Sequence, residues 1–187
     1  MNYAAVMPAD ELKYELIDGT TYMMAPPRMI HINIGGNLFH IIRSYLSGKR
    51  CKVFAEAPVI FDDANYFIPD LLVVCDRNKI RPNGIYGAPD LIIEILSPST
   101  QKRDWGIKKD TYEKYGVKEY WLVSPKEKSV TVYILQNGRY ELDNVYFDID
   151  QEEWEYMDDK ERAAQKFTLK ISLYDDFEIN VKDIFEE

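Results

Sequence analysis

Apolar residues at three- and four-residue spacing predict the first of two helices in this chain. They recur from Ile34 to Leu46 and make one helix face, which Gly48 closes. A second helix is expected from Asp104, which can cap its first turn, to Tyr115, with Gly116 as the stop signal. The second helix follows the strand that contains Glu94, and both helices are expected to flank a sheet.

Two dipeptides with glycine in second place predict β-hairpins. Asp18-Gly19 lies between the extended runs Tyr14–Ile17 and Thr20–Met24. Asn137-Gly138 joins a strand expected over residues 130–135 to another over residues 139–147. The first hairpin precedes all other predicted elements along the chain.

Further strands are expected where short apolar runs lie between turn residues. These runs are Lys52–Phe61, Leu71–Cys75, Leu91–Leu96 and Glu119–Val123. Leu91–Leu96 is apolar throughout except for Glu94, as is typical of a central strand covered on both faces. Strands interleaved with two helices predict an α/β fold, a mixed β-sheet flanked by α-helices with an N-terminal β-hairpin.

The length of 187 residues suits one domain over residues 1–187. Within it, residues 148–162 are rich in acids and are expected to form a loop or an exposed segment. Residues 178–185 are expected to pack back as a short strand and turn. With 46% hydrophobic residues, the chain can bury a substantial core and is not disordered by composition.

The formal net charge of −9 counts against simple binding to duplex DNA, because phosphate contacts need lysine and arginine. A locally basic face remains compatible with an acidic chain. The best candidate combines Lys102, Arg103, Lys108 and Lys109. The alternative is an ordinary solvated helix surface.

Cys51 and Cys75 lie in apolar-flanked stretches, so we expect buried thiols rather than a disulfide. The first 16 residues lack a basic region followed by an apolar run, and no apolar run approaches the ~20 residues of a membrane span. These patterns predict a cytoplasmic protein without a membrane segment.

Glu94 is the clearest candidate for chemistry. A carboxylate inside an apolar strand is costly to bury unless it is paired or binds a metal. A structural ion pair is one interpretation, and a metal ligand beside a second carboxylate from a neighbouring strand is the other. Oxygen ligands with open water positions suit Mg²⁺. Zn²⁺ is disfavoured because His31 and His40 stand alone, without a cysteine–histidine cluster.

Two Pro-Asp pairs precede apolar runs, Pro69-Asp70 and Pro89-Asp90. We interpret Asp90 as a strand-start residue that satisfies loop amides, and Asp70 as the better candidate for chemistry. Phosphodiester cleavage also needs a cation near the phosphorus. Lys108 can supply it, because its helix follows the Glu94 strand almost directly and its stem is flexible. An ordinary surface lysine is the alternative.

An ordered set of motifs resembles the Uma-type restriction endonucleases of the PD-(D/E)XK nuclease superfamily. The set comprises Tyr14-Glu15-Leu16-Ile17-Asp18-Gly19, Met24-Ala25-Pro26, His31, Pro69-Asp70, Pro89-Asp90 through Glu94 to Thr100, Asp104, Lys108, Tyr112, Gly116-Val117 and Glu119-Tyr120-Trp121. It covers most of the chain up to about residue 140. The resemblance implies a restriction-endonuclease-like fold.

By this resemblance, Asp70 and Glu94 correspond to metal-binding carboxylates and Lys108 to a displaced catalytic lysine. His31 matches a recurrent histidine and is an accessory candidate. The implied activity is hydrolysis of phosphodiester bonds in DNA with Mg²⁺, or Mn²⁺ in its place, and a homodimer would suit cleavage of two strands. Two alternatives stay open: a catalytically silent module that binds nucleic acid or a protein, and a hydrolase of smaller phosphates.

Overall fold

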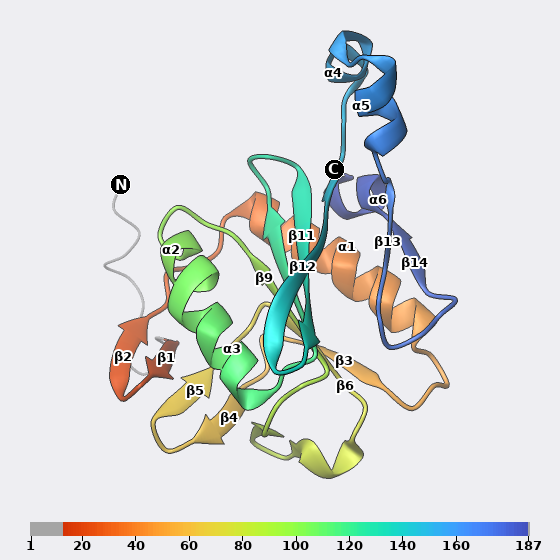
Figure 1. Ribbon diagram of the computed structural model, residues 1–187. Helices are drawn as coiled ribbons and strands as arrows, with labels where there is room; N and C mark the ends of the chain where they lie inside the picture. Colours follow the sequence, from red (N-terminus) through yellow and green to blue (C-terminus); the bar gives the residue numbers. More distant parts are fainter. Residues whose placement is uncertain (1–12, 187) are drawn as a thin grey trace.

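The computed structural model describes residues 13–186, and a six-stranded central sheet forms its middle (Figure 1). The strand order is β12-β11-β10-β9-β6-β3, where only β9 and β10 run parallel. The bounds of these strands are β3 Lys52–Ala55, β6 Leu71–Val74, β9 Leu91–Ile95, β10 Glu119–Ser124, β11 Ser129–Gln136 and β12 Arg139–Phe147. The predicted mixed α/β fold is confirmed.

A second sheet has the order β2-β1-β5-β4-β8-β7, and a separate β13–β14 hairpin lies near the C-terminus. The bounds are β1 Tyr14–Ile17, β2 Thr20–Met23, β4 Val59–Asp62, β5 Asn65–Phe67, β7 Ile80–Arg81, β8 Gly84–Tyr86, β13 Thr168–Lys170 and β14 Glu178–Asn180. The predicted strand over residues 52–61 is wrong as one element: it breaks into β3 and β4 at Glu56–Pro58, where Glu56 has φ 48°.

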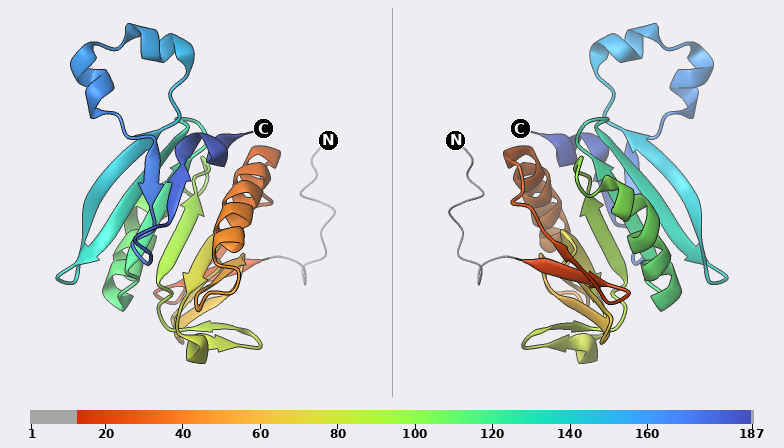
Figure 2. Two further views of the ribbon diagram at one scale, coloured as in Figure 1. Left: turned by 90° about the vertical axis from the view of Figure 1, so that its right-hand side faces the viewer. Right: turned by 90° about the vertical axis from the view of Figure 1, so that its left-hand side faces the viewer.

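Helices cover both faces of the central sheet (Figure 2). The helical segments of the described residues are α1 Met29–Tyr45, η3 Arg77–Lys79, α2 Gln101–Arg103, the π-helical turn η4 Asp104–Lys108, α3 Lys109–Tyr115, α4 Gln151–Tyr156, α5 Asp159–Ala164 and α6 Val181–Phe185. Those that pack on the sheet are α1 and α6 on one face and α3 on the other. None of the helices in the described part of the chain is long and apolar enough to cross a membrane.

The two faces of β9 pack against different partners because side chains alternate along a strand. Ile93 and Ile95 join a core with α1 and α6, while Ile92 joins a core with α3 and the second sheet. Glu94 therefore points to the α3 side. Its contacts there decide the chemistry of the molecule.

The predicted N-terminal hairpin is present as β1 and β2, with Asp18 and Gly19 both at positive φ. The second predicted hairpin, β11–β12, turns at Asn137-Gly138 in the same way. The acidic segment is an exposed pair of short helices, α4 and α5, that projects from the body (Figure 1).

Cys51 and Cys75 form a disulfide, so the expectation of two free thiols is wrong. The reason is strand register: β3 pairs with β6 so that Lys52 lies opposite Val74, which places the two cysteines across from each other at the end of the ladder. Register between strands is not visible in the cysteine spacing.

Candidate metal-dependent active site

A cavity of about 880 Å³ opens where β6 begins and β9 ends. Its walls include all four residues that the sequence singled out, His31, Asp70, Glu94 and Lys108. Glu15 from β1 and Asp104 from η4 complete the acidic part of the wall. Residues from five separate elements or loops thus converge on one hollow.

Asp70 and Glu94 come together because their strands are neighbours. Leu71 on β6 lies opposite Ile93 on β9, so one further step of the antiparallel register brings Asp70 beside Glu94. The Asp70 Oδ2 accepts a hydrogen bond from the backbone N–H of Ile95 at 2.6 Å. Both carboxylates therefore border the same space instead of opposite sides of the sheet.

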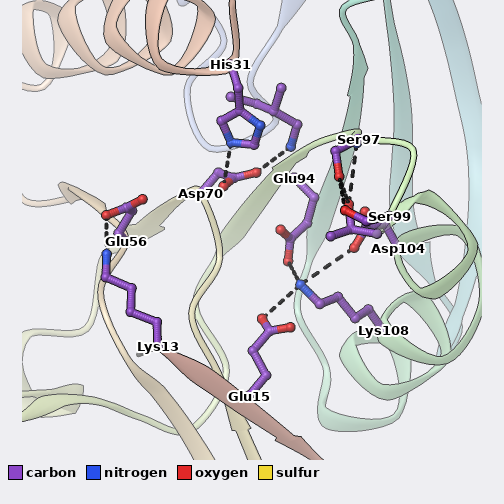
Figure 3. A network of polar contacts seen from close by, with 12 residues as sticks. Lys13, Glu15, His31, Glu56, Asp70, Glu94, Ser97, Ser99, Asp104 and Lys108 are labelled. Carbon is purple, nitrogen blue, oxygen red and sulfur yellow. Dashed lines mark hydrogen bonds and ion pairs between the residues drawn. The ribbon is translucent and has the colours of Figure 1, made fainter. Parts of the chain in front are cut away.

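Lys108 lies at the centre of a buried charge cluster (Figure 3). Its Nζ is 2.8 Å from Glu15 Oε1, 3.0 Å from Glu94 Oε1 and 3.6 Å from Asp104 Oδ1. Its side chain is only 3% exposed, so the alternative of an ordinary surface lysine is excluded. Three carboxylates raise the pKa of Lys108 against the effect of its burial, so it acts as a fixed positive charge.

Glu15 and Asp104 are the members of the cluster that sequence reasoning missed. Glu15 takes the inward position of β1, and nothing local in the sequence reveals its partner 93 residues away. Asp104 was expected to cap a helix. Instead the helix begins at Gln101, and the wide turn η4 places Asp104 and Lys108 four residues apart on one buried face. Single π-helical turns of this kind are common at functional sites.

The cluster carries more negative than positive charge. Glu15, Glu94 and Asp104 face one lysine, which leaves a formal excess of two negative charges when all are ionised. Burial raises the pKa of Glu94 well above its usual range, with Lys108 opposing the shift and Asp104, Asp70 and Glu15 adding to it. Burial likewise raises the pKa of Asp104. The site therefore favours uptake of a proton or a cation.

His31, near the start of α1, contacts Asp70 directly. Its Nε2 lies 2.9 Å from Asp70 Oδ1. Burial lowers the pKa of His31, but the hydrogen bond to Asp70 and the charge of that carboxylate outweigh it and leave the pKa raised. The contact holds the Asp70 carboxylate in one orientation toward the cavity.

The four cations expected to share a basic face are separated. Lys108 is buried in the cluster, and Lys109 lies over the ring of Tyr133 at 4.2 Å. Lys102 is exposed, while Arg103 lines the cavity. The expected basic face is therefore absent from this helix, because its irregular turn distributes the side chains in different directions.

The donor set fits a hydrated Mg²⁺ better than a closed metal site. Within residues 13–186, no three histidine, cysteine, aspartate or glutamate side chains are grouped as a complete ligand set. Mg²⁺ keeps several waters and commonly uses one or two carboxylates. Glu94 Oε1 accepts hydrogen bonds from Lys108 Nζ and from the hydroxyl of Tyr112. Among residues 13–186, no donor forms a hydrogen bond with Glu94 Oε2. Both oxygens of the buried Asp104 carboxylate also lack a hydrogen-bond partner there.

A mixed sheet whose neighbouring strands bring two carboxylates together at a cavity defines an α/β protein of the restriction-endonuclease-like class. The chain belongs to the Uma2 family, described as "Putative restriction endonuclease", whose model matches residues 3–159. The resemblance predicted from the sequence motifs is thereby confirmed.

Proteins similar to this chain include the following two. An uncharacterized protein of Synechocystis, slr1290, is 30% identical over 124 residues, which span 65% of each chain. A crystal structure described as a putative nuclease belonging to DUF820, from Anabaena variabilis, has a TM-score of 0.71 and 25% identity, covering 96% of this chain and 93% of that one. The predicted fold class agrees with this structural match.

The raised pKa values of Glu94 and Asp104 predict how stability depends on pH. A carboxyl whose pKa is higher in the folded state stabilises the fold below its unfolded pKa, and this stabilisation is lost as pH rises through the folded pKa. In EDTA, the free energy of unfolding should therefore fall from about pH 4.5 upward, by up to ~1.4 kcal/mol per pH unit for each such group. Thermal and urea unfolding between about pH 5 and 8 would measure it.

The variant Glu94→Gln isolates the contribution of this carboxyl. It should flatten the decline, while His31 and Glu119, whose pKa values are also raised, contribute equally in both proteins. Added Mg²⁺ should flatten the decline in the wild type but not in the variant. If the free energy of unfolding depended equally on pH in the two proteins in EDTA, the raised pKa of Glu94 would not be the cause of the decline.

Proposed function

We propose that the chain is a Mg²⁺-dependent endonuclease that hydrolyses phosphodiester bonds in DNA. The observation that supports this proposal most strongly is the pair of carboxylates, Asp70 and Glu94, brought by adjacent strands to one cavity beside a buried cation. Family membership supports the nuclease class. Mn²⁺ would occupy the same oxygen ligands as Mg²⁺.

Asp70 and Glu94 would hold the metal, while Asp104, whose carboxylate lines the same cavity, is not part of the proposed ligand pair. When bound, Mg²⁺ would polarise the phosphate and lower the pKa of a coordinated water. His31 would keep Asp70 aimed into the cavity through its hydrogen bond. Tyr112 would do the same for Glu94, since its hydroxyl donates to Glu94 Oε1 at 2.8 Å.

The role of Lys108 is electrostatic rather than that of a general base. Its pKa is raised, so it keeps its proton at neutral pH and cannot accept one from water. Its ammonium group is buried in the wall of the cavity, where a fixed positive charge can lower the energy of charge that develops on the phosphate. It also opposes the rise in the pKa of Glu94 that burial causes.

A nicking assay tests the proposal. Supercoiled plasmid, linear duplex and single-stranded DNA are incubated with the wild type in Mg²⁺, Mn²⁺ or EDTA, and Glu94→Gln is assayed in parallel. We expect nicking in both metals, none in EDTA, and at least a hundredfold slower reaction with Glu94→Gln, in line with losses seen when residues around a metal are changed.

Other outcomes discriminate the alternatives. Tight DNA binding without turnover in any metal would contradict the enzyme and support the silent module, whereas turnover of free nucleotides alone would support a hydrolase of smaller phosphates. The proposed homodimer would bring two sites to the two strands of a duplex. Sedimentation of the protein on duplex DNA would show whether two copies bind.

A further inference from the structure

Arg103 has an unusual environment for a charged side chain. Its Nε is buried and has no hydrogen-bond acceptor among residues 13–186. In that range, the other buried side-chain atoms without a partner are the two oxygens of Asp104, its neighbour in sequence. The two residues do not form an ion pair with each other. All of the unsatisfied buried polar atoms described thus lie at one turn, beside the cavity.

Tyr22 holds the Arg103 side chain in place. The guanidinium carbon lies 4.9 Å from the centre of the Tyr22 ring, which projects from β2 in the N-terminal hairpin. An aromatic ring attracts a cation over its face and fixes the plane of a guanidinium group. The group is therefore oriented before any ligand arrives, and it lines the cavity without a carboxylate partner among residues 13–186.

The two lysines that line the cavity already have partners, whereas the ion pairs found within residues 13–186 include none for its two arginines, the exposed Arg28 and the more buried Arg103. Lys108 is surrounded by Glu15, Glu94 and Asp104. Lys126 pairs with Glu127 at 2.9 Å. Arg103 is consequently an available positive charge next to an acidic site.

We propose that Arg103 binds a phosphate of the DNA strand next to the one that is cleaved, with Tyr22 as the platform for its guanidinium group. This inference rests on the proposed function and names a residue that the metal site does not include. A guanidinium edge matches two phosphate oxygens with parallel hydrogen bonds, and an ammonium group does not. In a chain of net charge −9, the contact would supply one positive charge for a polyanion beside three carboxylates.

Binding of a fluorescein-labelled 12-nucleotide DNA, single-stranded and duplex, tests this proposal. Fluorescence anisotropy is measured in Ca²⁺ at several salt concentrations for the wild type and for Arg103→Gln, Arg103→Lys and Tyr22→Leu. The matched control is Lys102→Gln, which removes the same charge from the adjacent exposed position. Unfolding curves and Mg²⁺ calorimetry accompany each variant.

We expect Arg103→Gln to weaken DNA binding about tenfold and to reduce the slope of log Kd against log salt by about one phosphate contact. Arg103→Lys should restore the salt slope but only part of the affinity, and Tyr22→Leu should weaken binding severalfold. Lys102→Gln should stay within about twofold of the wild type. Mg²⁺ affinity should be unchanged in Arg103→Gln. An altered salt slope together with unchanged Mg²⁺ affinity indicates a direct phosphate contact, because a merely structural role would not produce that combination.

Equal losses in Arg103→Gln and Lys102→Gln, or an unchanged salt slope in Arg103→Gln, would overturn the proposal. If Arg103→Gln proved unfolded, the comparison of Arg103→Lys with Lys102→Gln would decide in the same way. The two proposals can fail separately. If the wild type binds DNA through Arg103 but never cleaves it, only the proposed enzymatic activity is contradicted. If Arg103→Gln cleaves and binds DNA like the wild type, only the phosphate contact is contradicted.

Discussion

Replacing Lys108 by methionine should lower the free energy of unfolding by about 3–5 kcal/mol at neutral pH and abolish cleavage. Lys108 is the central cation of three buried carboxylates, and removing one partner of a buried ion pair leaves uncompensated charge in a dry environment. Methionine keeps most of the volume of the side chain, so the loss reports the charge and not a cavity. Urea denaturation and the nicking assay would measure both effects.

Lys109→Met is the matched control, because Lys109 is the next residue and its ammonium lies over the ring of Tyr133 instead of in the cluster. Its loss should cost less than ~1 kcal/mol. Adding Glu15→Gln to Lys108→Met should recover part of the lost stability by removing one unpaired charge. A Lys108→Met protein as stable as Lys109→Met would refute the buried charge cluster.

Asp70→Asn should slow DNA cleavage at least a hundredfold and weaken Mg²⁺ binding, with little change in stability. Asparagine keeps the oxygen that can accept from the N–H of Ile95 but loses the charge that a metal needs. A loss of this size is expected because substitution of residues that only support the metal ligands already costs about 10–100-fold in metal affinity or activity. Single-turnover cleavage and Mg²⁺ calorimetry are the measurements.

Asp90→Asn is the control for Asp70→Asn, since each aspartate follows a proline just before an apolar run. Asp90 accepts hydrogen bonds from the N–H of Cys75 and from Lys118 and does not line the cavity. Its substitution should cost about 1–2 kcal/mol of stability and leave the rate per folded molecule unchanged. Equal loss of activity in both variants would remove the special role of Asp70.

Local sequence chemistry predicted the elements that depend on neighbouring residues. Asp18-Gly19 and Asn137-Gly138 form the expected turns because their backbones adopt positive φ. The apolar spacing from Ile34 to Leu46 falls on α1 and its C-cap, Leu46, although the helix begins earlier than the pattern, at Met29. Gly116 ends α3 in a left-handed conformation, as a C-terminal glycine does.

Features that depend on contacts between residues far apart in the chain could not be predicted from the sequence. The disulfide requires the β3–β6 register, and the contact between Glu15 and Lys108 requires β1 to lie beside the helical segment 101–115. Asp104 was misassigned because a cap and a buried charge look alike in sequence; only the π-helical turn separates them. By contrast, Glu94 was conspicuous, since a lone carboxylate in an apolar strand needs a partner.

The most direct test of a metal ion shared by Asp70 and Glu94 is a crystal soaked in Mn²⁺ and measured for anomalous scattering. The shared metal site requires a peak in the cavity within coordination distance of both the Asp70 and Glu94 carboxylates, and no peak there in Glu94→Gln crystals. A fully soaked wild-type crystal with no peak in the cavity, or with one that touches only one of the two carboxylates, would contradict it.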